Sequence, residues 1–358
     1  MLNVFNKKAI ARRDFLKLGG QCAAASVLAG PLAACAQEES GVFVGSRRAP
    51  VIDIHAHCAF AEVIDLLEGT SLNWPLSKIR LLGPKRLEDM AARRIDTQVL
   101  SINQYWWYEA DEALANDIVR LHDEKLKEWC DEHEGKFAAL SSVALQFPEL
   151  AAEQLEYAVK ELGLKGASVG GHVNGVVPTG EEFDPFWAKC EELGVPVFVH
   201  PDSAKNIVQE NAFEGRGELA NIIGNPLETT VFLSKMIFDG TLDRFPGLVL
   251  VGAHGGGYLP SYLGRTDVAC DVRPGANCAN QRRPGEYLRD QIVADTMVFS
   301  HEGLRHLKAE MGASQIVYGT DIPFNWPDVL DLILEADYLD DDEEIAILGG
   351  NLQRLLKL

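Results

Sequence analysis

The sequence predicts an α/β fold, a (β/α)8 or TIM barrel, on two observations. From residue 50 onward, short segments rich in valine and isoleucine alternate eight times with longer segments of helical periodicity, which is typical of a parallel sheet. Residues that can bind a metal ion follow several of the apolar segments. A closed barrel brings the carboxyl ends of its strands onto one face. An open doubly wound sheet, the alternative fold, would not gather them around one point.

The eight expected strand–helix pairs follow one another without a second-domain boundary. The apolar segments are almost continuously hydrophobic, as are strands buried on both faces of a parallel sheet, and Pro148 and Asp328 mark helix starts. The expected strands are 51–54, 97–102, 137–143, 164–169, 197–199, 248–251, 292–294 and 316–318. The expected helices are 87–94, 110–133, 150–162, 183–193, 227–239, a segment after Pro260, 303–311 and 329–338, and 273–284 reads as a surface loop.

The composition suits one large domain and limits the partners. The 358 residues are 47% hydrophobic and 24% charged, which is enough for a sizeable core. The formal net charge of −20 argues against nucleic acid and anionic lipid as partners. An anionic substrate would therefore need a local basic pocket.

Residues 1–35 are expected to be a twin-arginine export signal, and the folded domain is expected over residues 50–358. The stretch ARRDFLKLGG places Arg12 and Arg13 before an alanine-rich, weakly hydrophobic segment. A chance arginine pair on an amphipathic helix is the alternative. The signal ends in LAAC, which resembles the lipobox of bacterial lipoproteins, so cleavage before Cys35 would leave that cysteine acylated. We expect export to the periplasm with a lipid anchor at Cys35. Cleavage after the small residues Ala34, Cys35 and Ala36 would instead release a soluble periplasmic protein.

The cysteines that follow show no CxxC spacing. In an exported protein, Cys270 can pair with Cys278 across a loop. Cys130 and Cys190 lie on helical patterns, and we expect them to be buried free thiols.

Five polar residues at expected strand ends form a candidate metal site. They are His55 and His57 in VIDIHAH, His200 in VPVFVHPD, His254 in LVLVGAHGGG and Asp321 in QIVYGTDIPF. Residues two apart on a strand face the same side, so the two histidines of VIDIHAH can both turn toward the barrel axis. Imidazole nitrogens with one carboxylate suit zinc and other first-row metals and leave a position open for water.

These segments resemble the amidohydrolase superfamily. ASVGGHVNG, FVHP, NPLETT, AHGGGYLPSYLGR and YGTDIPF, which follow one another along the chain, are similar to the branch that contains 2-amino-3-carboxymuconate-6-semialdehyde decarboxylase. The resemblance implies an amidohydrolase-type barrel in which His55, His57, His200 and Asp321 bind one divalent metal. It also implies that His254 is the acid/base partner of the metal-bound water, and that the protein is a homodimer.

The expected site holds a single metal ion. Members with two metals use a carbamylated lysine at the end of the fourth strand, whereas here Lys165 stands at the start of that strand and no lysine stands at its end. Zinc is the favoured ion, and the mixed nitrogen and oxygen ligands also admit manganese.

The residues expected to bind the substrate rest on weaker patterns. Trp106, Trp107 and Tyr108 follow the second strand and suit an aromatic wall, although helix packing is the alternative for one of them. Arg265 ends YLPSYLGR, and the resemblance implies that it binds a substrate carboxylate, partly across a subunit interface; a surface ion pair is the alternative. His172 suits substrate contact and loop packing equally.

The chain also departs from the branch. Its first strand-to-helix loop, which carries Arg80, Lys85 and Arg86, is shorter, and Asp202 stands where the branch has a tryptophan after FVHP. Asp295, at the end of the seventh strand, reads as a supporting residue and not a catalytic one.

The expected function is a metal-dependent decarboxylase, a carbon–carbon lyase that acts on an unsaturated or aromatic carboxylic acid. His254 and Asp321 would manage the proton that replaces CO2. A metal-dependent hydrolase of a lactone, ester or amide is the alternative, and a non-catalytic metal-holding lipoprotein is a third. A basic anchor in the pocket would favour the decarboxylase, whereas a neutral or hydrophobic pocket would favour the hydrolase.

Overall fold

Eight parallel strands lie at the centre of the fold in this computed structural model. The structure describes residues 41–358 except 104, 205, 206 and 210, and Gly41–Leu358 form one compact unit. The expected export signal and lipobox lie outside the described residues. The eight strands are β3 (Ile52–His57), β4 (Thr97–Ser101), β5 (Phe137–Ala139), β6 (Ala167–Gly170), β7 (Val197–His200), β8 (Leu250–Gly252), β9 (Ile292–Asp295) and β10 (Ile316–Val317).

The strands follow their chain order around a barrel. Hydrogen bonds join β3, β4 and β5 in one sheet and β6 to β10 in another. A parallel bridge between Ser141 and Ala167 links the two sheets beyond β5. The Ile54 N–H donates to the Tyr318 carbonyl at 3.1 Å, which links β3 to β10. The expected (β/α)8 barrel is confirmed.

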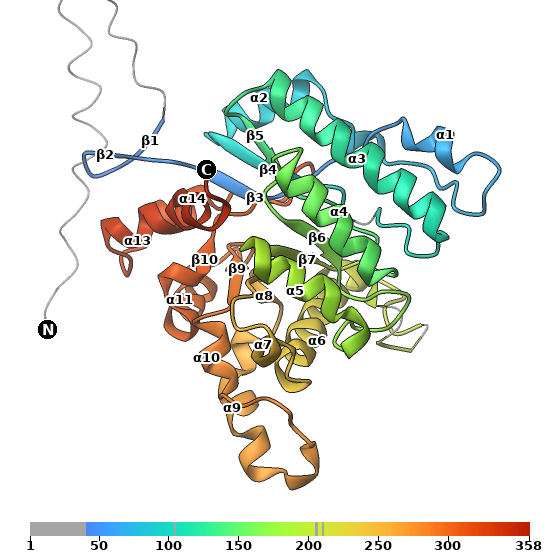
Figure 1. The fold of residues 1–358 in the computed structure, drawn as a ribbon. Coiled ribbons are helices and arrows are strands. Elements are labelled where there is room, and N and C mark those ends of the chain that lie inside the picture. The colour runs from blue at the N-terminus through green and yellow to red at the C-terminus, as the bar shows by residue number, and fades with distance from the viewer. Residues whose placement is uncertain (1–40, 104, 205–206, 210) are drawn as a thin grey trace, which may run out of the picture. The chain divides into compact units, whose positions relative to one another are not determined.

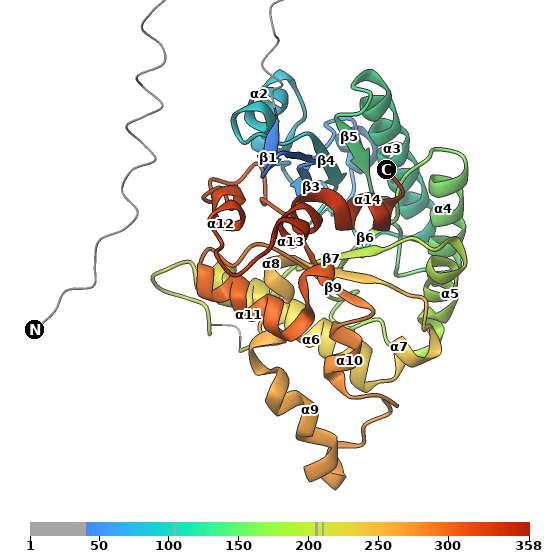
Figure 2. The ribbon, with the colours of Figure 1, turned by 90° about the vertical axis from the view of Figure 1, so that its left-hand side faces the viewer.

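Helices cover the strands, each lying near its expected position (Figure 1). Each starts for a local reason: proline occupies the first turn of four of them, and Asp111 and Ser300 cap two others by accepting backbone N–H groups. The helices are α2 (Pro84–Ala92), α3 (Glu112–Glu132), α4 (Pro148–Lys160), α5 (Asp184–Leu193), α6 (Asn225–Phe238), α9 (Leu263–Val272), α11 (His301–Met311) and α12 (Leu330–Leu334). In Figure 2, α3, α4 and α5 lie side by side. The eighth helix is shorter than expected, because the chain turns after Leu334.

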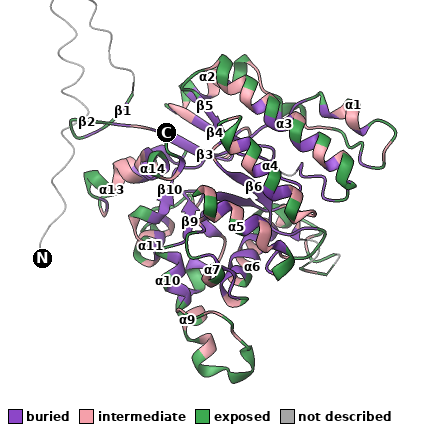
Figure 3. Ribbon diagram, in the orientation of Figure 1, coloured by how far each residue is buried: buried purple, intermediate pink, exposed green. Residues whose placement is uncertain are grey.

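Two apolar clusters form the core, and Figure 3 shows the barrel strands buried and the outer helix faces exposed. The larger cluster lies between the strands and the helices. The smaller one takes residues from β3, β4, β5, β7, β8, β9 and β10. It also includes Leu352 and Leu356 of α14 (Asn351–Leu356), so this helix closes the barrel interior. The polar residues of the candidate site are left to the carboxyl ends of the strands.

The segment after β8 projects from the barrel as α9 and the loop that follows it (Figure 1). A disulfide joins Cys270 to Cys278 there, as expected. Cys130 and Cys190 are free thiols, of which Cys190 is buried and Cys130 partly buried. Within the described residues, no helix combines the length and apolarity that crossing a membrane requires.

Candidate metal centre and active site

The four expected metal ligands meet at the carboxyl ends of β3, β7 and β10. The potential ligand atoms of His55, His57, His200 and Asp321 all lie within 4.8 Å of one another, and all four residues are buried. His57 Nε2 lies 2.8 Å from Asp321 Oδ1, and His55 Nε2 lies 3.2 Å from the same oxygen. We call these four residues the metal cluster.

The donor set of the metal cluster fits one divalent ion. Within the described part of the chain, His200 Nδ1 is buried without a hydrogen-bond partner, an arrangement that normally requires an explanation. Burial lowers the pKa of His57 to about 4 and that of His200 well below its ordinary value. Both rings are therefore neutral, the form that binds a metal. Burial also disfavours a charge on His55, but Asp321 and Asp295 outweigh it and raise the pKa of His55 to about 10. Three imidazole nitrogens and one carboxylate suit Zn2+ or Mn2+.

Asp295 supports the metal cluster from β9, as its position in the sequence suggested. One of its oxygens lies 2.7 Å from His55 Nδ1 and accepts the N–H of His254 at 3.0 Å. The other accepts the N–H groups of Gly255 at 2.7 Å and Met297 at 3.1 Å. This one carboxylate therefore orients both an expected ligand and the backbone that carries His254.

His254 lies beside the metal cluster and outside its ligand group. Its ring centre is 5.2 Å from that of His55 and 5.4 Å from that of His200. The ring is partly exposed, while its Nδ1 is buried with no partner among the described residues. Burial lowers the pKa of His254, so it stands as a neutral base near the cluster. The placement suits the acid/base role that the resemblance implies.

Backbone conformation sets the position of His254. The residue itself adopts a left-handed conformation with φ of 56°, which non-glycine residues rarely adopt. Gly257, which follows it in the chain, also has a positive φ, and a Cβ there would lie 2.3 Å from the Pro226 carbonyl oxygen. Only glycine fits that close approach to the start of α6.

The aromatic run after β4 divides between the site and the helix layer. The Trp106 ring lies 6.5 Å from the His200 ring, stacks on Tyr108, and donates its Nε1–H to the Ser168 carbonyl at 2.9 Å. Trp107 instead stacks on His122 of α3. The helix-packing alternative therefore applies to Trp107, whereas Trp106 lies beside the metal cluster.

The other two expected substrate contacts differ in their surroundings: His172 is packed in the loops after β6 and β7, and Arg265 lies on α9. His172 uses both ring nitrogens within the loops: Nδ1 accepts the Gly175 N–H at 3.1 Å, and Nε2 lies 3.0 Å from the Ser203 carbonyl oxygen. Arg265 is exposed on α9. Their roles in substrate binding stay predictions.

Arg80 is a candidate site residue that sequence reasoning did not select. It is only 7% exposed, and its guanidinium lies over the rings of Tyr105 at 4.9 Å and Phe324 at 5.3 Å. The Phe324 ring is in turn 5.1 Å from that of His57. A buried positive charge therefore lies next to the metal cluster. No motif surrounds Arg80, and its place follows from the packing of three distant loops.

A buried polar network around β3 also escaped sequence reasoning. Asp53 accepts hydrogen bonds from Gln98 and from the backbone and side chain of Thr320. Arg86 donates to the His57 carbonyl at 2.6 Å. These contacts fix the strand that carries two ligands. Asp53, two residues before the first histidine of VIDIHAH, was the only visible signal.

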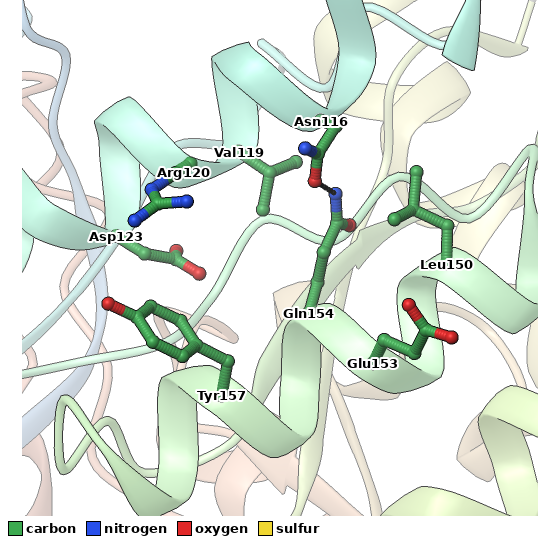
Figure 4. A pocket seen from close by; sticks show the side chains of 8 residues that line it. All are labelled: Asn116, Val119, Arg120, Asp123, Leu150, Glu153, Gln154 and Tyr157. Atoms are coloured by element: carbon green, nitrogen blue, oxygen red, sulfur yellow. Dashed lines mark hydrogen bonds between the residues drawn. The ribbon is translucent and has the colours of Figure 1, made fainter. Parts of the chain in front are cut away.

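Two hollows differ in their relation to this site. A cavity of about 300 Å³ has His254 in its wall, and its other lining residues follow β7, β8, β9 and β10. A smaller one of about 150 Å³ lies between α3 and α4, where Gln154 donates to Asn116 at 3.2 Å (Figure 4). Its lining residues include Asp123 and Tyr157 and none of the expected site residues.

Comparison with known proteins identifies relatives over most of the chain. It is 30% identical over 280 residues to the 2-amino-3-carboxymuconate-6-semialdehyde decarboxylase of Dictyostelium discoideum, which covers 76% of each chain. It is 30% identical over 297 residues to the gamma-resorcylate decarboxylase of Rhodococcus jostii, covering 76% of this chain and 88% of the relative. A dihydroxybenzoic acid decarboxylase from Polaromonas, solved with manganese and the inhibitor 2-nitroresorcinol, superposes with a TM-score of 0.75 at 27% identity over 87% of this chain and 97% of the other.

Residues 52–358, the barrel and its metal cluster, match the family model described as amidohydrolase. The relatives are decarboxylases by name, and a decarboxylase is a carbon–carbon lyase. The chain belongs to the amidohydrolase family and is a metal-dependent enzyme of this superfamily with a site for one divalent ion.

Proposed function

We propose that this protein is a decarboxylase with one metal ion that acts on an aromatic or unsaturated carboxylic acid. The observation that carries the proposal is Arg80, a buried cation beside the metal cluster. A planar guanidinium suits a carboxylate, and such a basic anchor distinguishes a decarboxylase from a hydrolase on this scaffold. The names of the relatives support the same class of substrate.

The residues of the site divide the reaction between them. Arg80 holds the substrate carboxylate, and Trp106 packs against the ring of the substrate and excludes water. The metal cluster would hold a divalent ion, which would supply a Lewis acid that stabilises negative charge on the substrate. For this step His254 first takes up a proton from solvent. The bond between the ring carbon and the carboxylate then breaks, CO2 leaves, and the ring carbon takes that proton, which returns His254 to its neutral form. Asp321 keeps its negative charge next to His55 and His57, and this charge favours the protonated form of His254 that delivers the proton.

The test records CO2 and titratable acid together. Metal-loaded protein is mixed with aromatic and muconate-like acids, lactones and esters, and we expect CO2 without net ester hydrolysis. His254→Asn should retain the metal and lose at least about a hundredfold in kcat, the usual worth of a general acid/base. Metal loss in this variant would instead make His254 a ligand.

Arg80→Gln tests the anchor. We expect a rise in KM for carboxylate substrates of at least about tenfold, while Arg120→Gln, on an exposed arginine of α3, serves as the matched control. An unchanged KM in Arg80→Gln would contradict the proposed carboxylate contact.

Hydrolysis of a lactone, ester or amide is a second candidate, because the cavity beside His254 is lined largely by apolar side chains. Acid release without CO2 in the same assay would establish it.

The choice of ion and the setting of the enzyme are part of the proposal. Zinc and manganese both suit the ligands, and metal analysis of protein isolated from its own cells would choose between them. We further propose twin-arginine export, acylation of Cys35 and assembly as a homodimer. Fatty-acid labelling compared between wild type and Cys35→Ala tests the anchor, and sedimentation tests the assembly.

A further inference from the structure

The cavity beside His254 is larger than the reaction at the metal cluster requires. Its volume is about 300 Å³, and an apolar cavity of roughly half that size is enough to hold benzene. Six apolar or aromatic residues line it: Ile222, Pro226, Tyr258, Met297, Phe299 and Trp326. Such a space fits a second ring or a short alkyl chain.

The rim of this cavity exposes apolar side chains to solvent. Phe299 is 40% exposed and Ile222 is 47% exposed. Phe299 stacks on Trp326 with ring centres 5.3 Å apart, and the Tyr258 hydroxyl donates to the Ile222 carbonyl at 3.4 Å. The rim is therefore held in place before any ligand arrives, and an apolar group bound there would cover it.

The backbone at Phe299 is an independent sign of function. Its φ is 51°, a left-handed conformation that is a true outlier for a bulky residue. Residues held in such conformations cluster at active sites and ligand clamps. His254, which borders the same cavity, and Asp321 of the metal cluster share this conformation, with φ of 56° and 58°. Three of the nine non-glycine residues with positive φ in the described part of the chain therefore belong to the metal cluster or the wall of the cavity.

The location of the cavity complements that of Arg80. Arg80 packs on Tyr105 and Phe324, after β4 and β10, whereas the cavity lies between the start of α6 and the loops after β8, β9 and β10. His254, the proposed proton donor, lies between the metal cluster and the cavity. A substrate whose carboxylate faces Arg80 can therefore extend past His254 into the cavity.

We infer that this cavity is a subsite for an apolar substituent, so that the substrate is an aromatic acid carrying an aryl or alkyl group. The inference rests on the proposed decarboxylation and makes the substrate larger than a hydroxybenzoate without such a substituent.

The test compares 2,6-dihydroxybenzoate with derivatives carrying methyl, butyl or phenyl at each open ring position. For the metal-loaded enzyme, we expect at least one butyl or phenyl derivative to exceed the parent acid about tenfold or more in kcat/KM, which is the scale of selectivity of apolar pockets. A second readout needs no turnover: titration calorimetry should show 4-biphenylcarboxylate binding at least about tenfold tighter than benzoate.

Two matched variants locate the effect. Phe299→Asn removes the ring and suits the left-handed backbone. It should lower both ratios, that of kcat/KM between derivative and parent acid and that of affinity between 4-biphenylcarboxylate and benzoate, at least about threefold. Phe43→Asn removes a ring of similar exposure, 41%, from β1 (Val42–Val44) and should leave both ratios unchanged.

Several results would overturn the inference, and they are separable from failure of the proposed function. If the enzyme decarboxylates the parent acid and prefers no derivative, the subsite inference is wrong and the proposed function stands. If no acid releases CO2, the proposed function is wrong. If benzoate and 4-biphenylcarboxylate then also bind equally, the subsite inference is wrong as well. If Phe299→Asn changes the mass in sedimentation and leaves both ratios intact, the rim belongs to a contact with a second copy of the chain.

Discussion

Replacing Asp295 with asparagine exchanges one carboxylate oxygen for an amide nitrogen at a position that four groups share. The two oxygens accept from the backbone N–H groups of His254, Gly255 and Met297 and face His55 Nδ1. Asp295 is fully buried, so water cannot replace a lost partner. Whichever way the new amide turns, its NH2 group faces two of these four donors.

The structure sets the scale of the effect. Two of the four hydrogen bonds are lost, and a hydrogen bond to a charged group contributes about 1.5–3 kcal/mol. The free energy of unfolding of the variant therefore falls by about 3–6 kcal/mol before any relaxation of the structure. The substitution also weakens metal binding, because Asp295 orients the ring of His55. Changes of this kind typically weaken metal binding about 10- to 100-fold, or about 1.4–2.8 kcal/mol. We therefore expect Asp295→Asn to fold with reduced stability and to bind its ion at least tenfold more weakly.

The assay is competition for Zn2+ or Mn2+ between metal-free protein and a chelator of known affinity. Asp123→Asn is the control, because Asp123 is equally a buried carboxylate but lies between α3 and α4, away from the site (Figure 4). It should retain the affinity of the wild type. A metal Kd for Asp295→Asn within twofold of wild type, with an unchanged kcat, would refute the role assigned to Asp295.

Two further predictions concern stability. Burial raises the pKa of Asp123 from 3.8 to about 7. The stability that the protonated Asp123 contributes is fully present below pH 4 and is lost as the pH rises through 7, because the carboxyl of the unfolded chain ionises at lower pH. Between pH 4 and 8, urea unfolding should show wild type losing up to about 4 kcal/mol more than Asp123→Asn, and parallel curves would contradict this. The disulfide between Cys270 and Cys278 closes a short loop, with a sequence separation of 8. Cys270→Ser should therefore lower stability by about 2.5 kcal/mol, and an unchanged Tm on reduction would count against it.

The metal cluster was predictable from sequence because its members belong to short, local patterns. His55, His57, His200 and Asp321 each end an apolar strand, and a parallel barrel brings strand ends together whatever the loops do. The place of His254 beside the cluster, and not in its ligand group, came from the resemblance and agrees with the ring distances.

The substrate-facing part was less predictable because it depends on how loops pack. Arg80 reaches the site through contacts with Tyr105 and Phe324, which are far away in sequence. No short sequence pattern predicts that Arg80 is buried whereas Arg265 is exposed. For the same reason, the sequence alone could not predict that Trp106 lies near the metal cluster whereas Trp107 packs on α3.

The barrel closes between its first and last strands, and the metal cluster spans that seam. The Ile54 N–H donates to Tyr318 and the His57 N–H donates to Ile322 across it, while Asp321 stands on the opposite side from His55. An ion held by all of them would fasten the two ends of the folded domain, so that metal supply and folding are coupled. If the chain is exported by the twin-arginine route, as we propose, it crosses the membrane already folded. The ion would then be chosen by the compartment in which the chain folds and not by the one in which it works.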